Sequence, residues 1–431
     1  MLIDQQRLAP QDEWLVEPAF LRKRMDSYFE NPRRRAWPEG EHILVGREPG
    51  PGGLLLRSND YLAMASHPDV LAAVRRDVAV DADAAIMAAV FLHGATPQSR
   101  FESAMATLLG SEATVLSQSG WAANTGLLQS IVEPGTPVYI DMFAHMSLHE
   151  GIRLGGGCPH MFRHNNVRAL EQLVRRHGPG FIVVDSIYST TGAIAPLREL
   201  VELSERHGCV LIVDEAHSLG THGPRGAGLV AELGLTARVH FRTASLAKAF
   251  AGRAGIVACS TRAAEFLKYQ ANPAIFSSGL MPSEIARLDA IRQAIEGADD
   301  RRSRLRAVAQ RLREGLRQLG YCLGGSESQI VSLHPGEEWR LIALRNALEA
   351  RGVFGSVFCA PATPANGALL RFTLHSALGD DDIERVLAAC AEVRDRVQLA
   401  AWASTRRMHV RRQAEQDTGS PRHSDVPAEA C

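Results

Sequence analysis

The chain has 431 residues, 45% of them hydrophobic, and its 47 basic and 48 acidic side chains leave a formal net charge of −1. This size allows a large buried core, and we expect one large and one smaller domain. The balanced charge gives no broad attraction for nucleic acid, and no apolar run approaches the roughly 20 residues of a membrane-spanning helix. The first residues lack the layout of a signal peptide, which favours a cytoplasmic location.

The cysteines indicate neither a disulfide framework nor a metal site. All 7 are scattered singly, without a C-x-x-C pair, at positions 158, 209, 259, 322, 359, 390 and 431. His145 and His149 lie at helical spacing, but no third residue has a matching spacing, so we expect no metal.

The first 57 residues read as an N-terminal arm rather than a domain. A charged helix is expected at 18–28, followed by a stretch rich in Arg, Pro and Gly, which suits a lid or an interface segment. Over 58–281, apolar strands at 181–186, 209–215 and 238–245 alternate with helices at 168–178 and 197–208. This alternation is typical of an α/β fold with a mostly parallel central sheet.

The rest of the chain predicts a second domain and a tail. Over 282–398, long helices at 283–319, short strands near Ile330 and Leu370 and a last helix at 380–397 indicate a smaller C-terminal α+β domain. Residues 399–431 are charged and lack apolar periodicity, so we expect a disordered tail.

Open α/β sheets bind ligands at the carboxyl ends of their strands, and one such end carries Asp214. A buried carboxylate there needs a positive partner. A protonated pyridine nitrogen is one such partner, and the alternative is a helix cap or a pair with an arginine. His217 follows three residues later, before a glycine-rich loop.

The next strand leads into a loop of small residues that holds Lys248. A lysine that forms a Schiff base needs a lowered pKa and space for an aldehyde, which small neighbours provide. Most lysines are solvated surface charges, but this one follows Asp214 on a later strand of the same sheet.

Two further strand ends carry candidate ligand-binding residues. In 113–132, Ser119 is the expected N-cap of a helix opened by Gly120 and Trp121, whose free amides suit a phosphate; an ordinary strand-to-helix turn is the alternative. His145 lies between a strand and a helix, where its imidazole could stack on a pyridine ring. The alternative is a histidine with a purely structural role.

Four features occur in the order found in the α-oxoamine synthase family: SQSGW, His145, DEAHSLG and SLAK. The chain resembles this family over residues 55–397. Segments such as YIDMFAHMSLHEG, NPAIFSS and GVFGSVFCAPAT are most similar to the CqsA-type branch, which makes quorum-sensing autoinducers. The resemblance implies a fold type I, aspartate aminotransferase-like pyridoxal 5′-phosphate (PLP) transferase. The stretch 91–100 replaces the family's glycine-rich G-S-G-G-S-R segment, which disfavours glycine as substrate.

The resemblance also implies roles for individual residues. Lys248 would form the Schiff base and remove the α-proton, Asp214 would pair with the pyridinium nitrogen, His217 with the ring hydroxyl, and His145 would stack on the ring. The residues matched to cofactor contacts are Ser119, Gly120, Trp121, Ser189 and Ser245. Ser277 and Ser278 would contact the phosphate from the neighbouring subunit of a homodimer. Arg371 would bind the substrate carboxylate, and Asn59 would lie at the entrance of the active site.

The implied reaction is a decarboxylating condensation of S-adenosylmethionine or 2-aminobutyrate with a medium- or long-chain acyl-CoA. Three alternatives remain: an 8-amino-7-oxononanoate synthase or a glycine-using acyltransferase, an aminotransferase of the same fold, and a non-catalytic sensor. The absence of a helix-turn-helix pattern and the joint presence of Lys248, Asp214 and both histidines argue against the sensor.

Overall fold

The computed structural model describes residues 17–30, 43–77 and 87–408, and residues 1–47 form a unit separate from 48–431. In the first unit, helix α1 (Ala19–Phe29) lies where the sequence predicts a helix. The Arg-rich stretch at 31–42 and the tail beyond Met408 lie outside the described residues. Among the described helices, none has the length and apolarity needed to cross a bilayer.

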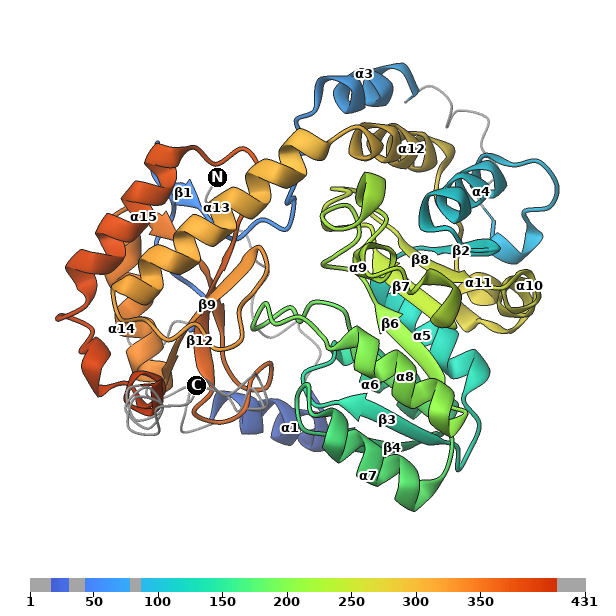
Figure 1. Ribbon diagram of the computed structural model, residues 1–431, viewed down its shortest axis with the longest axis horizontal. Coiled ribbons are helices and arrows are strands. Elements are labelled where there is room, and N and C mark those ends of the chain that lie inside the picture. The colour runs from blue at the N-terminus through green and yellow to red at the C-terminus, as the bar shows by residue number, and fades with distance from the viewer. Residues whose placement is uncertain (1–16, 31–42, 78–86, 409–431) are drawn as a thin grey trace. The chain divides into compact units, whose positions relative to one another are not determined.

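A seven-stranded sheet forms the centre of the second unit (Figure 1). Its strands, in spatial order, are β2 (Ala113–Ser117), β8 (Gly255–Cys259), β7 (Phe241–Ser245), β6 (Val210–Asp214), β5 (Phe181–Asp185), β3 (Pro137–Asp141) and β4 (Cys158–Phe162). The five strands from β7 to β4 are parallel, and β8 is antiparallel to both of its neighbours. The predicted mostly parallel sheet is therefore confirmed.

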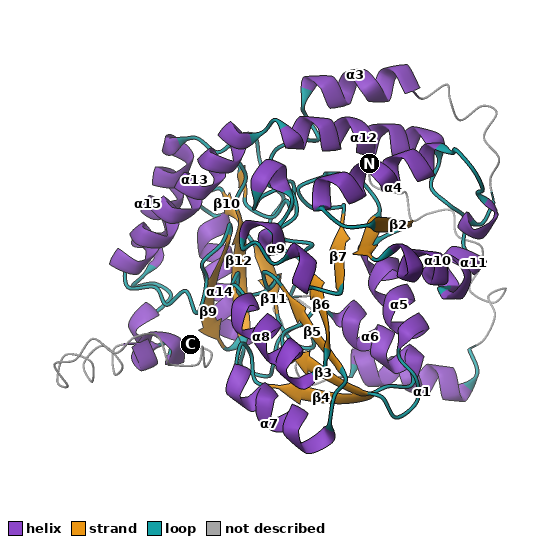
Figure 2. Cartoon of the chain, turned by 45° about the vertical axis from the view of Figure 1, so that its right-hand side comes forward, coloured by secondary structure: helices purple, strands orange, loops and turns teal. Residues whose placement is uncertain are grey.

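Helices cover both faces of this sheet (Figure 2). They are α4 (Pro97–Leu109), α5 (Gly120–Ile131), α6 (Met146–Gly155), α7 (Val167–His177), α8 (Leu197–His207), α9 (Leu229–Glu232), α10 (Thr261–Gln270) and α11 (Asn272–Phe276). Right-handed crossovers place α5 and α6 on one face and α7 and α8 on the other, because the chain changes direction along the sheet after β4. Gly208 ends α8 in the left-handed conformation, with φ 65°, as glycines at helix C-termini commonly do.

The core under α5 and α6 is almost wholly aliphatic. Val138, Ile140, Val183 and Ile212 from the strands pack against Leu127 and neighbouring side chains of the helices, and all are buried. Strands buried on both faces read as continuous Val, Ile and Leu runs, which is why their positions could be predicted.

A second, three-stranded antiparallel sheet has the order β11 (Ser356–Phe358), β12 (Ala368–Thr373), β9 (Ile330–Gly336). The helices that follow the large sheet in the chain are α12 (Pro282–Glu296), α13 (Asp299–Gln318), α14 (Glu338–Glu349) and α15 (Asp380–Val393). The helices expected at 283–319 are α12 and α13, which are separated at Gly297 and Ala298.

Two boundaries differ from those expected. Strand β1 (Leu54–Leu55), within the expected arm, pairs in parallel with β10 (Val353–Phe354), and α3 (Pro68–Asp77) follows it. Residues 399–408, within the expected tail, are packed and partly helical. Trp402 explains the second difference: its side chain is fully buried and its ring meets Tyr321 edge-on at 5.8 Å. One aromatic anchor orders a segment that has no apolar periodicity.

Candidate active site

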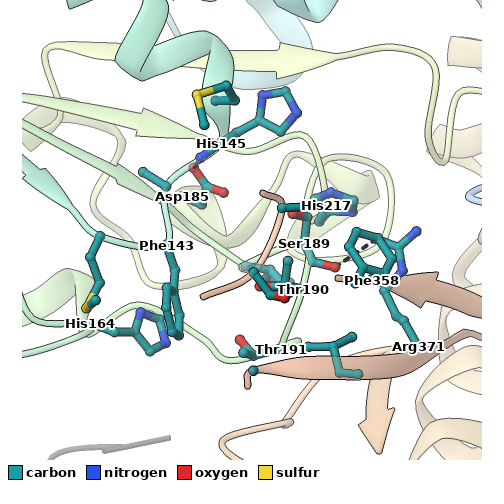
Figure 3. A pocket seen from close by; sticks show the side chains of 18 of the residues that line it. Phe143, His145, His164, Asp185, Ser189, Thr190, Thr191, His217, Phe358 and Arg371 are labelled. Carbon is teal, nitrogen blue, oxygen red and sulfur yellow. Dashed lines mark hydrogen bonds between the residues drawn. The ribbon is translucent and has the colours of Figure 1, made fainter. Parts of the chain in front are cut away.

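A cavity of about 1050 Å³ lies at the carboxyl ends of β5, β6 and β7, between the two sheets. Most of the site residues expected from the sequence line it: Gly120, Trp121, His145, Ser189, Asp214, His217, Ser245, Lys248 and Arg371. Figure 3 shows His145 and Asp185 at one end of the cavity, and Phe358 and Arg371 beside Ser189. Residues far apart in the sequence thus meet in one cavity, as strand ends in open α/β sheets do.

Asp214 ends β6 as a buried carboxyl group held by two donors. The Asn124 side-chain amide donates to it at 2.7 Å, and the Ala216 backbone N–H donates at 2.8 Å. Burial raises the pKa of Asp214, and the Asn124 hydrogen bond opposes that rise. The carboxyl group therefore has hydrogen bonds but lacks full charge compensation, so the site suits a ligand with a cation at this point.

Lys248 follows β7 and points into the same cavity. Burial lowers the pKa of Lys248, the Arg371 charge lowers it further, and Asp214 acts in the opposite direction. A larger share of neutral amine at ordinary pH makes Lys248 a nucleophile and a base.

His145 is the N-cap of α6 and belongs to a polar chain that ends at Asp214. Its Nδ1 lies 2.7 Å from the Ser147 hydroxyl, which accepts from the Asn124 amide at 2.9 Å. Burial lowers the pKa of His145, so its ring is predominantly neutral. A neutral imidazole facing the cavity can stack on a flat ligand.

His217 follows Asp214 by three residues, lines the same cavity and is buried. Its Nδ1 is 2.6 Å from the Tyr61 hydroxyl, and its backbone carbonyl accepts from the Gln329 amide at 2.7 Å. Burial lowers the pKa of His217 well below its usual range. The imidazole is therefore neutral and fixed in position.

Arg371 enters the cavity from β12 of the three-stranded sheet. Its Nη1 donates to the Ser189 carbonyl at 2.8 Å, and its guanidinium lies 4.6 Å above the Phe358 ring. The Nε atom is buried and has no protein partner among the described residues. A carboxylate can satisfy such a guanidinium.

The start of α5 closely approaches the end of β7. Ser119 caps the helix, with its side chain accepting from the Ala122 N–H. A Cβ added to Gly120 would lie only 2.5 Å from Cβ of Ser245. The glycine is therefore required by the close approach, which puts the free amides of the helix beside the Ser245 hydroxyl as an anion cradle.

Four expected site residues do not line the cavity within one copy of the chain. Ser119 caps the N-terminus of α5. Asn59 lies next to Tyr61, with its Oδ1 3.4 Å from the Tyr61 hydroxyl. Ser277 and Ser278 are exposed, and the Ser278 carbonyl accepts from Gln118. Their assigned roles stay predictions.

Three residues of the site were missed from the sequence. Asp185 ends β5 opposite Asp214, and burial followed by the Asp214 charge raises its pKa well above the usual range. Its position at a strand end was a usable signal. Asn124, inside a helix, and Tyr61, far away in the sequence, gave no such signal.

These side chains fit the cofactor that the resemblance implies. Asp214 can hold a ring nitrogen, His217 a ring oxygen, Lys248 an aldehyde carbon and the α5 terminus a phosphate. Among the described residues, no three His, Cys, Asp or Glu side chains are placed to hold a metal ion.

Comparisons with known proteins agree with this geometry. The family described as Aminotransferase class I and II matches residues 51–389. The CAI-1 autoinducer synthase of Vibrio campbellii is 45% identical over 382 residues, covering 89% of this chain and 97% of that protein. The 8-amino-7-oxononanoate synthase of Coprothermobacter proteolyticus is 31% identical over 368 residues, covering 84% of this chain and 92% of that protein. The solved Sphingomonas wittichii serine palmitoyltransferase superposes with a TM-score of 0.77 at 26% identity, covering 89% and 98%.

Proposed function

Because the chain belongs to the aminotransferase class I and II family, and within it to the α-oxoamine synthases, we propose that it joins an amino acid to the acyl group of an acyl-CoA. Pyridoxal 5′-phosphate is the cofactor, and CoA and CO2 are released. The observation that carries this proposal is the meeting of Lys248, Asp214, His217 and Arg371 in one cavity. When bound, the cofactor withdraws electrons from the α-carbon of the amino acid.

Lys248 removes the α-proton of the amino acid. Burial and the Arg371 charge lower the pKa of Lys248, so its amine can accept a proton at neutral pH. The α-carbon then attacks the thioester carbonyl, the carbon–sulfur bond breaks and CoA leaves. Loss of CO2 breaks the bond to the carboxylate, and a proton returned to the α-carbon completes an α-aminoketone.

The remaining side chains position the reactants. Arg371 binds the substrate carboxylate, since its buried guanidinium has an Nε without a protein partner. With the cofactor bound, Asp214 would keep the ring nitrogen protonated, His217 would donate to the ring oxygen, and His145 would stack on the ring. Asn59 lies at the entrance. The cofactor phosphate would be held by Ser245 and by the amides that follow Ser119, at Gly120 and Trp121. Ser189 would lie next to the cofactor.

We extend the proposal to a homodimer with shared active sites. Ser277 and Ser278 of the neighbouring subunit would reach the phosphate. Their exposure within one copy supports this, as does Phe276 beside them, which is 80% exposed. The enzyme acts in the cytoplasm. The domain division is a large cofactor-binding domain and a smaller C-terminal domain.

The amino donor is S-adenosylmethionine or 2-aminobutyrate, and the acyl chain is medium or long, so that the product is a quorum-sensing autoinducer. The higher identity to the CAI-1 autoinducer synthase than to the 8-amino-7-oxononanoate synthase supports this choice. The second candidate, an 8-amino-7-oxononanoate synthase or glycine acyltransferase, is favoured only by the lower-identity relatives.

The test is to incubate PLP-loaded protein with each donor and a series of acyl-CoAs, while following thiol release and identifying products by mass spectrometry. We expect thiol release with the larger donors and a decarboxylated α-aminoketone. Clear preference for glycine or alanine would overturn the autoinducer assignment alone. Amino transfer to keto acids without thiol release would indicate an aminotransferase, and no turnover of any kind would favour a sensor.

A further inference from the structure

One wall of the cavity has no assigned role in the reaction. This wall, here called the small-sheet wall, consists of Gly324, Gly325, His334 on β9, the loop 361–367, Leu369 on β12 and Arg407. Figure 3 shows the nearby Thr191 and Phe358 on the side of the cavity away from His145. The wall is thus built from the three-stranded sheet and the C-terminal segment.

The C-terminal segment is fixed to this wall by specific contacts. It lies beyond the stretch matched by the family, which ends at residue 389. Trp402 is fully buried, its indole N–H donates to the Val397 carbonyl at 2.9 Å, and the Ser404 hydroxyl donates to the His334 carbonyl at 2.6 Å. These contacts bring Arg407 to the rim of the cavity, so the segment is a built part of the cavity wall.

Two polar atoms of this wall are buried without a partner among the described residues: Nε2 of His334 and the Thr363 hydroxyl. Burial, and then the Arg407 charge, lower the pKa of His334 to about 4, so its ring is neutral at ordinary pH. A buried polar atom without a partner costs about 1–3 kcal/mol. A polar ligand would remove that cost, whereas an alkyl chain would not.

The charges around the cavity are separated. Among its described lining residues, the acidic ones are Asp185 and Asp214, which are paired neighbours at the ends of β5 and β6. The three-stranded sheet and the C-terminal segment contribute Arg371 and Arg407 instead. Since the acidic lining residues lie at the other end, this side of the cavity carries the two guanidinium charges.

We propose that Arg407 and His334 form a second anion subsite, which binds a phosphate of the CoA moiety or a carboxylate at the far end of the acyl group. This inference rests on the proposed function, since it assigns the subsite to the acyl donor. Arg371 binds the carboxylate of the amino acid, and the second subsite lies at the rim. Arg407 donates to the anion, and His334 donates through an N–H of its neutral ring.

The test is equilibrium binding to the PLP-loaded protein by calorimetry, which does not depend on turnover. The probes are coenzyme A, pantetheine without phosphates, a medium-chain dicarboxylate and the matching monocarboxylate. Arg407→Met keeps the apolar stem and removes the charge, and Arg407→Lys keeps the charge. Arg406→Met is the control, because Arg406 is exposed on the same turn but does not line the cavity.

We expect Arg407→Met to weaken the binding of one anionic probe by about fivefold, the upper range for a partly exposed charge contact. Arg407→Lys should retain most of the affinity for that probe, and Arg406→Met should retain all of it. A loss for coenzyme A but not pantetheine identifies a phosphate, and a loss for the dicarboxylate but not the monocarboxylate identifies a carboxylate. Equal binding by both Met variants, or failure of the unmodified protein to bind either anion, overturns the subsite. Activity with acyl-CoA would leave the proposed function standing.

Discussion

The Tyr61 hydroxyl lies 2.6 Å from Nδ1 of His217, and both side chains are buried. Burial raises the pKa of Tyr61, so the hydroxyl keeps its proton. Its other acceptor, Oδ1 of Asn59, is 3.4 Å away. We therefore infer that the tyrosine donates to Nδ1, which leaves the imidazole proton on Nε2 and makes Nε2 a hydrogen-bond donor.

Replacing Tyr61 with Phe removes the donor that sets this tautomer. We expect the pH titration of the bound cofactor's visible absorbance to shift, and kcat to fall about tenfold, because a buried hydrogen bond to a positioned group is lost. Tyr321→Phe is the matched control, since Tyr321 is also buried and its hydroxyl donates to the Cys390 carbonyl, outside the cavity. An unchanged absorbance titration in Tyr61→Phe would contradict the tautomer assignment.

The chain has three lysines, Lys23, Lys248 and Lys268, which makes attachment of the cofactor easy to map. Borohydride treatment of the PLP-loaded protein should leave a stable adduct on the peptide with Lys248, as found by mass spectrometry. Lys248→Ala should abolish the adduct. Lys268→Ala should retain it, because Lys268 pairs with Glu102 outside the cavity. An adduct on another lysine, or none, would refute the proposed chemistry.

Replacing Asn124 with Ala should move the acid limb of the kcat/KM profile. Its hydrogen bond stabilises the Asp214 carboxylate and so lowers the pKa of that group. Without this hydrogen bond the pKa of Asp214 rises, so its carboxylate becomes protonated at a higher pH. The acid limb of the kcat/KM profile therefore moves to higher pH. Thr125→Ala is the control, because the Thr125 hydroxyl donates to a helix carbonyl. A downward shift, or none, would show that Asp214 is not the titrating group.

Replacing Gly120 with Ala should separate α5 from β7. The new Cβ would lie 2.5 Å from Cβ of Ser245, so the phosphate cradle must widen. We expect the affinity for PLP, measured by fluorescence titration, to fall by at least about tenfold, as expected for loss of charge-assisted hydrogen bonds. Gly50→Ala should leave it unchanged, since nothing lies within 4 Å of that position. Normal PLP affinity in Gly120→Ala would place the phosphate elsewhere.

Much of the fold could be predicted because local patterns carry it. The apolar strands ending at Asp185 and Asp214, the glycine after α8 and the serine before α5 were each readable over a few residues. The α-oxoamine synthase resemblance is confirmed by the comparisons. Lys248 and Asp214 were predicted to meet because carboxyl ends of parallel strands share one edge of a sheet.

What the sequence determined by itself was therefore the order of the elements, the family and the strand-end residues of the site. The tertiary structure alone decided the contacts between distant segments: Tyr61 on His217, Asn124 on Asp214, and Arg407 on the cavity wall through buried Trp402. The physical reason is that periodicity and caps act over one or two turns of chain. A hydrogen bond or ring contact across the fold depends on packing, which leaves no local pattern.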